Sequence, residues 1–162
     1  MNRRQFVGLL STSAIALTLL KGKLSMADHG TVDKLTLSED EWKKRLTAEQ
    51  FRVLRKDGTE RAGTSILNEE KRKGVYACAG CDLPLFKSEH KYESGTGWPS
   101  FFNYIEGHLE TSVDFKLIYP RTEYHCARCG GHQGHLFKDG PAPTGIRYCN
   151  NGVALKFIPE DA

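Results

Sequence analysis

The sequence has little net charge, and the small excess is confined to its beginning. The formal net charge of the 162 residues is +3. Residues 1–27 contain four basic residues and no acidic one, which leaves 19 basic against 20 acidic residues in the remainder. A chain without a basic patch lacks the electrostatic basis for binding nucleic acid. We therefore expect no nucleic-acid partner.

Long apolar runs are also missing. The mostly apolar stretch Phe6–Leu20 has 15 residues and includes several Ser and Thr, whereas a transmembrane helix needs about 20 apolar residues. No cysteine follows this stretch, which argues against lipid attachment there. The chain has no low-complexity segment and no internal repeat beyond its cysteine pairs. The length and these absences indicate a single domain with a modest core.

The first residues have the parts of an export signal. Arg3 and Arg4 form a charged start, the apolar stretch follows, and Ser25-Met26-Ala27 resembles a cleavage site. The Arg pair favours the twin-arginine route; an ordinary secretory signal and an uncleaved anchor are the alternatives. We expect residues 1–27 to be an export signal, residues 28–37 a linker and residues 38–160 the domain. The protein would then be periplasmic, with no stable membrane insertion after cleavage.

The domain is predicted to begin with two short helices and to continue with strands. Ser38 with Glu41, and Thr47 with Gln50, form capping boxes, which predict helices over about 39–46 and 48–55. After residue 74 the pattern alternates with period two, most clearly over 113–119 and 153–158. The fold class is therefore α+β and mainly β, with antiparallel sheets that a metal ion would stabilise.

Four of the five cysteines form two C-x-x-C pairs. Cys78 and Cys81 are one pair, and Cys126 and Cys129 are the other. Two such pairs can close a tetrahedral four-thiolate site, which leaves no position open for substrate. Redox-active dithiols are the alternative, but those usually open a helix, and strand-like residues follow here. We predict one structural Zn²⁺ per chain.

The fifth cysteine, Cys149, is the candidate nucleophile. In an extended segment over 146–151, Arg147 and Asn151 would share a face with it. Arg147 could then lower the pKa of the thiol, and Asn151 could bind substrate or water. A buried, inert cysteine on a strand is the alternative reading. The local sequence alone does not decide between the two.

Two further segments carry possible site residues. His132 and His135 follow the second cysteine pair and could donate hydrogen bonds or a proton to a polar substrate. Metal ligation by these imidazoles is an alternative, although it would leave Cys78 and Cys81 without a role. The segment 95–102 combines a glycine-rich turn with three aromatic residues, Trp98, Phe101 and Phe102. Those aromatic rings could form an apolar pocket for a methyl or thioether group, or belong to the core.

Taken together, these motifs resemble the methionine sulfoxide reductase B family, the peptide-methionine (R)-S-oxide reductases. The resemblance covers roughly residues 38–159. Its most specific pieces share a fixed order along the chain: Ser94–Phe101, Arg121–Glu123, Cys126–His135, Asp139–Pro141 and Gly145–Asn151.

The resemblance implies a β-tent of antiparallel sheets, a structural zinc on the cysteine pairs, and an oxidoreductase that repairs oxidised proteins under oxidative stress. Cys149 would attack the sulfoxide and become a sulfenic acid. Trp98 and Phe101 would hold the methyl group, and Arg147 would tune the thiol. His132, His135 and Asn151 would bind and activate the sulfoxide.

The implied substrates are oxidised methionine residues in client proteins, and possibly free methionine sulfoxide. The implied reductant is a thioredoxin-like protein or another thiol. We expect the protein to be a monomer. Many family members carry a recycling cysteine where this chain has Thr96. The residues 61–65 also lack the aromatic pattern usual in the family. A non-catalytic zinc-ribbon module that binds another protein is the alternative function.

Overall fold

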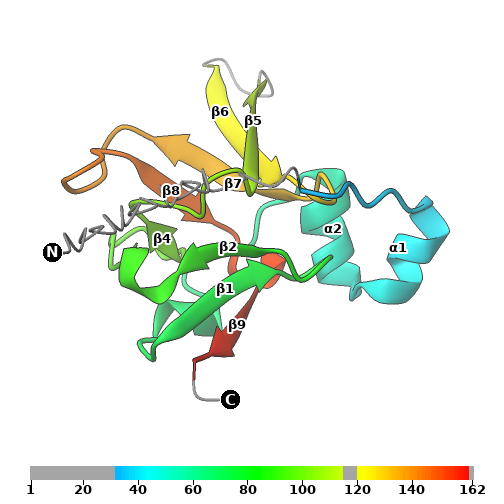
Figure 1. Ribbon diagram of the computed structural model, residues 1–162, viewed down its shortest axis with the longest axis horizontal. Helices are drawn as coiled ribbons and strands as arrows, with labels where there is room; N and C mark the ends of the chain where they lie inside the picture. The colour runs from blue at the N-terminus through cyan, green and yellow to red at the C-terminus, as the bar shows by residue number, and fades with distance from the viewer. Residues whose placement is uncertain (1–31, 115–119, 161–162) are drawn as a thin grey trace, which may run out of the picture.

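The computed structural model describes residues 32–114 and 120–160 (Figure 1). The predicted export signal therefore lies outside the described residues, as do residues 28–31 of the predicted linker. Within the described residues, no helix has the length and apolar character needed to cross a membrane. Cleavage, export and the twin-arginine route stay predictions.

Both capping boxes form as the sequence predicts, and each starts a short helix. Helix α1 spans Glu39–Arg45 and α2 spans Ala48–Lys56. Each helix satisfies its first free N–H groups through an N-cap hydroxyl, and the third helical side chain returns the bond. Asp57 ends α2 in the left-handed conformation, with φ of 50°. Trp42 of α1 and Val53 and Leu54 of α2 are buried, so both helices pack against the rest of the domain.

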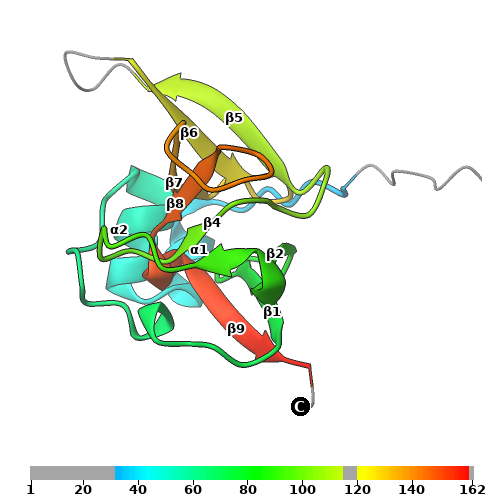
Figure 2. The same cartoon turned by 90° about the vertical axis from the view of Figure 1, so that its left-hand side faces the viewer.

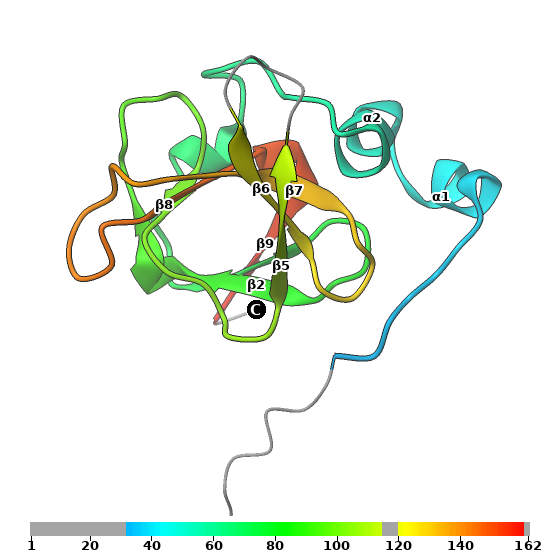
Figure 3. The same ribbon diagram turned by 90° about the horizontal axis from the view of Figure 1, so that it is seen from above.

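The strands form two antiparallel sheets, which confirms the predicted α+β, mainly β class. One sheet has the order β2-β1-β9, and the other has the order β3-β4-β8-β7-β6-β5. The two sheets lie one above the other in Figure 2, and the helices flank them on one side in Figure 3. The strands are β1 Gly74–Cys78, β2 Pro84–Lys87, β3 Lys91–Tyr92, β4 Ser100–Phe101, β5 Leu109–Asp114, β6 Arg121–Cys126, β7 His132–Phe137, β8 Arg147–Asn150 and β9 Leu155–Pro159. Three short 3₁₀ helices complete the elements: η1 Ile66–Asn68, η2 Ser88–His90 and η3 Gly152–Ala154.

Aromatic rings fill the space between the two sheets. Phe86 and Phe101 stack with their centroids 4.1 Å apart, and Tyr76 meets Phe101 edge-on at 5.0 Å. Phe101 has 0% of its surface exposed. It was predicted to bind substrate, but here it belongs to the core, because its place on β4 points the ring inward between the sheets.

Two strand predictions differ from the structure. β5 starts earlier than predicted, at Leu109, and residues 115–119 of the predicted strand lie outside the described residues. The alternation within β5 places Asp114, which is 4% exposed, inside the domain and leaves Val113 57% exposed. The last strand starts only at Leu155, because the preceding backbone turns in η3. That turn is held by the Glu60 carboxylate, which accepts a hydrogen bond from the Val153 N–H at 2.6 Å.

Candidate active site and metal centre

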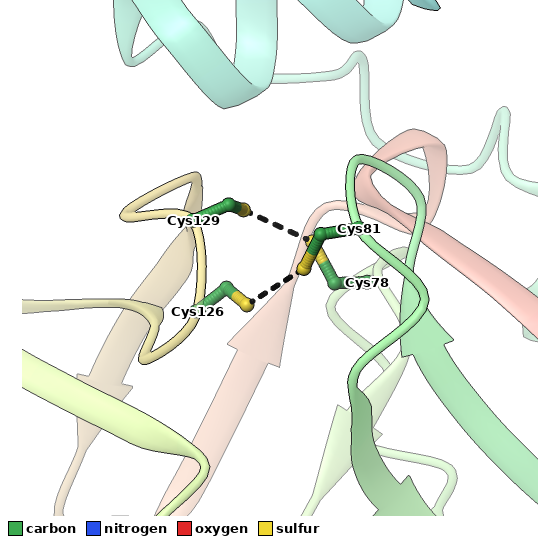
Figure 4. Close-up of side chains that lie close together, drawn as sticks. All are labelled: Cys78, Cys81, Cys126 and Cys129. Carbon is green, nitrogen blue, oxygen red and sulfur yellow. Dashed lines mark hydrogen bonds between the residues drawn. The ribbon is translucent and has the colours of Figure 1, made fainter. Parts of the chain in front are cut away.

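The four paired cysteines converge on one point, as predicted. Their sulfurs all lie within 4.8 Å of one another, and all four side chains are buried. The closest sulfurs belong to different pairs: Cys78 Sγ is 3.7 Å from Cys129 Sγ, and Cys81 Sγ is 3.4 Å from Cys126 Sγ (Figure 4). Zinc–sulfur bonds of about 2.3 Å in a tetrahedron place sulfurs about 3.8 Å apart. The four thiols can therefore hold a metal ion.

The turns that present these cysteines have matching backbones. Cys78 and Cys126 end strands β1 and β6, so each pair begins where a sheet strand stops. The residue after each pair, Asp82 or Gly130, has a left-handed φ of 63° or 65° and donates its N–H to the carbonyl of the first cysteine. Both pairs thus form tight metal-binding turns. Both pairs converge on one point, which a four-thiolate metal site requires and two independent redox dithiols do not.

Cys149 lies apart from the metal centre, in the middle of the larger sheet. On β8 it pairs with His135 of β7 on one side and with Ser100 of β4 on the other. Its thiol is half-buried. Gly134 allows the close approach of β7, because a Cβ there would come within 1.9 Å of the Cys149 carbonyl oxygen. The predicted nucleophile is therefore held by backbone pairing on both sides.

The thiol opens into a small pocket of about 110 Å³. A pocket of this size accepts the end of one side chain rather than a cofactor, since drug-sized sites exceed about 300 Å³. Three other predicted site residues, Trp98, His135 and Asn151, line it. The other lining residues are Thr59, Arg121, Gly134, Phe137 and Asn150.

Trp98 and Asn151 are held through the backbone of Glu60. The Trp98 indole donates to the Glu60 carbonyl at 2.9 Å, and the Glu60 N–H donates to Asn151 Oδ1 at 2.8 Å. Asn151 Nδ2 donates to the Gln133 carbonyl at 2.9 Å. The Asn151 side chain therefore links the backbone at Glu60 to the backbone at Gln133 of β7. One of its two N–H donors remains for a ligand.

Arg147 does not line the pocket but lies behind it. Its guanidinium donates two hydrogen bonds to the Asp139 carboxylate, at 2.9 and 2.8 Å, and stacks 4.3 Å over the Phe137 ring. The positive charge of Arg147 acts to lower the pKa of the Cys149 thiol, as predicted, and a hydrogen bond with the Thr96 side chain acts in the same direction. Burial nevertheless outweighs both and raises the pKa of Cys149 above its ordinary value.

His135 is oriented by a buried carboxylate that sequence reasoning missed. Asp114 Oδ2 lies 2.9 Å from His135 Nε2 and accepts a hydrogen bond from Arg121 at 2.6 Å. This contact leaves His135 Nδ1 available for a ligand in the pocket. The only sequence sign of the role of Asp114 is its position as an acidic residue within a strand-like run.

His132 is brought close to His135 but not into the pocket lining. Their ring centroids are 5.4 Å apart. His132 is 1% exposed, and burial lowers its pKa to about 4, so the imidazole is neutral at pH 7. Glu123 lies beside it, with Oε2 3.4 Å from His132 Nδ1. His132 can therefore influence a ligand only through its contact with His135, because it does not line the pocket itself.

Comparison with known proteins gives clear sequence matches. Residues 46–159 match the SelR domain. A "Peptide methionine sulfoxide reductase MsrB" from Leptospira interrogans is 51% identical over 124 residues, which cover 76% of this chain and 95% of that protein. This chain belongs to the methionine sulfoxide reductase B family.

A second sequence relative and one solved structure also match this chain. A protein of the same name from Methanosarcina barkeri is 53% identical over 125 residues, covering 76% of this chain and 88% of that protein. A solved structure, "Crystal Structure of Mis18 'Yippee-like' Domain", aligns with a TM-score of 0.42 at 14% identity, over 54% of this chain and 96% of that one. Membership in this family rests on the MsrB sequences and the SelR domain match.

Proposed function

We propose that this protein reduces the R epimer of methionine sulfoxide, in peptides and possibly as the free amino acid, to methionine. The observation that carries the proposal is the position of the Cys149 thiol at the mouth of a small pocket shared with Trp98 and His135. Similar proteins bear the name peptide methionine sulfoxide reductase. The Trp98 ring offers an apolar wall for a methyl group, and the pocket volume of about 110 Å³ suits the tip of a single side chain.

The first step transfers oxygen from substrate to enzyme. The Cys149 thiolate bonds to the sulfoxide sulfur, while His135 Nδ1, held through Nε2 by Asp114, hydrogen-bonds the sulfoxide oxygen and supplies a proton. The protonated oxygen then moves to the Cys149 sulfur, and the transient sulfur–sulfur bond breaks. The S–O bond of the substrate breaks, the sulfoxide is reduced by two electrons to the thioether, and Cys149 becomes a sulfenic acid. The remaining Asn151 N–H stabilises the charge that develops on oxygen, and His132 supports this through its contact with the His135 ring.

The second step needs two external thiol groups. A thiolate of a thioredoxin-like or other dithiol reductant attacks the sulfenic acid, and water leaves. A second thiol then releases Cys149 and forms a disulfide on the reductant. Among the described residues, the four remaining cysteines all belong to the metal centre. Thr96, whose side chain acts to lower the pKa of Cys149, occupies the position at which many family members carry a recycling cysteine.

The metal centre has a structural role in this proposal. Four buried thiolates fill the coordination of a Zn²⁺ ion and leave no site for substrate. One zinc per chain would tie β1 to β6, and with them the two sheets.

A stereochemically resolved assay tests the function. Purified enzyme with dithiothreitol should convert peptide-bound methionine-R-sulfoxide and leave the S epimer nearly untouched. Cys149→Ser should abolish turnover, because a hydroxyl is a far poorer nucleophile at neutral pH. The variant should keep the metal and the fold, since Cys149 lies outside the metal centre. Equal activity on both epimers would contradict the epimer assignment, and no activity on either would leave the zinc-ribbon binding module as the better account.

A further inference from the structure

A second group of side chains with metal-ligand chemistry includes His132, whose ring contacts that of the pocket residue His135. Asp57, His125 and His132 each offer one ligand atom, and the three atoms lie within 4.8 Å of one another. None of these residues belongs to the four-cysteine centre. They come from the end of α2, from β6 and from the start of β7.

The backbone holds these three residues in place. His125 and His132 are direct partners in the β6–β7 pairing, and their ring centroids are 5.6 Å apart. Side chains at opposite positions of neighbouring strands leave the sheet on the same face. Asp57 is set by the left-handed end of α2, and α2 packs against β7. The three ligand atoms are therefore positioned before any ion arrives.

His132 shows the clearest sign of a missing partner. It is 1% exposed, and neither ring nitrogen has a hydrogen-bond partner among the described residues. Buried polar atoms nearly always have a partner, whether protein, water or ion. Glu123 Oε2 lies 3.4 Å from Nδ1. A carboxylate beside one ring nitrogen, with the other nitrogen presented to a cation, is the usual arrangement of a metal-binding histidine.

We propose that Asp57, His125 and His132 form a second metal site, for a divalent transition-metal ion such as Zn²⁺ or Co²⁺. Two imidazoles and one carboxylate suit these ions, and they disfavour Mg²⁺ and Ca²⁺, which prefer oxygen ligands throughout. Metal–ligand bonds of about 2.0–2.2 Å require ligand atoms within about 4 Å of one another, so small side-chain rotations would close the site. Water would complete the coordination, because Asp57 is exposed and the His125 side chain is 20% exposed.

A metal ion here would inhibit the enzyme reversibly. It would engage the His132 imidazole, which lies 5.4 Å from His135 by ring centroids and which we assign to sulfoxide activation. This consequence rests on the proposed function, whereas metal binding itself does not.

Cobalt binding to the zinc-loaded protein tests the proposal. Equilibrium dialysis against CoCl₂ should give one Co²⁺ per chain in addition to the zinc. The visible spectrum should show weak d–d bands and lack the intense near-ultraviolet thiolate bands of cobalt bound to cysteine. His125→Gln and Asp57→Asn should each weaken binding by at least about tenfold, since each removes a direct ligand. Asn suits the left-handed backbone at this position, so the second variant should fold normally.

His90→Gln is the matched control. This histidine is also half-buried but belongs to no metal-ligating group among the described residues, so its substitution should leave cobalt binding unchanged. The proposal is overturned if no stoichiometric cobalt binds, if binding survives both ligand substitutions, or if the spectrum shows thiolate ligation. Stoichiometric binding with full reductase activity would keep the site and remove only the predicted inhibition.

Discussion

Asp114→Asn should lower kcat and leave KM almost unchanged. In the structure the Asp114 carboxylate is 4% exposed and contacts both His135 Nε2, at 2.9 Å, and Arg121, at 2.6 Å. A hydrogen bond to a charged group contributes about 1.5–3 kcal/mol, and both bonds are weakened rather than abolished by an amide. We therefore expect the free energy of unfolding to fall by about 2–4 kcal/mol.

The larger effect should be on catalysis. Without the carboxylate, the His135 ring can turn, and Nδ1 no longer points to the sulfoxide oxygen. Misplacing a catalytic group by about 1 Å can cost up to about 100-fold in rate. We expect kcat to fall about 10- to 100-fold with little change in KM, because Trp98 and the pocket wall still bind the methyl group.

The assay pairs steady-state kinetics with denaturant unfolding. Val53→Ala is the matched control, because this α2 side chain is 0% exposed and lies outside the pocket. Its truncation should cost about 2 kcal/mol of stability and leave kcat unchanged. If Asp114→Asn keeps kcat within about twofold of the wild type, or loses activity only in proportion to the fraction unfolded, Asp114 does not position His135.

Three other predictions follow from the same geometry. Cys78→Ser should lose the bound metal and destabilise the domain, because metal binding contributes to folding; elemental analysis with thermal unfolding measures both, and a metal-free wild type that stays fully folded would contradict it. After one equivalent of substrate without reductant, the intact mass of the wild type should rise by about one oxygen. The Thr96→Cys variant should instead form a disulfide with Cys149 and lose about two hydrogens. A disulfide in the wild type, with zinc released, would refute a cycle in which Cys149 is the only reacting cysteine. Single-turnover oxidation of Cys149 should accelerate as pH rises past neutrality, because burial holds its pKa above the ordinary value and the thiolate fraction grows with pH. Arg147→Met should move the midpoint of this pH dependence to higher pH. A rate independent of pH would count against attack by the thiolate.

Local sequence signals predicted the helices and the metal centre well. A capping box specifies where a helix starts through two hydrogen bonds within four residues, so Ser38 and Thr47 were sufficient. Likewise, each C-x-x-C turn is a local structure that points two thiols the same way. These features need no knowledge of what packs around them, and for that reason their positions agree with the structure.

Which face of a strand is buried could not be predicted in the same way. Alternation shows that Val113 and Asp114 face opposite sides, but not which side is covered. β5 is an edge strand beyond β6, and Asp114 at its end contacts Arg121 and His135. Asp114 is therefore buried and Val113 exposed. Phe101 was misassigned for the related reason that a turn sequence does not show which of its aromatic rings enters the core.

The pairing of β1 with β9 makes the metal centre depend on residues far from its ligands. Cys78 lies directly opposite Leu155, in the strand that comes last in the described chain. During synthesis, all four cysteines leave the ribosome before this strand does, so they can meet a metal ion while β1 still lacks one of its two neighbours. Such long-range pairing is slow to form. The complete domain is therefore reached only after β9 is made, and until then the thiols remain open to oxidation or to the wrong metal.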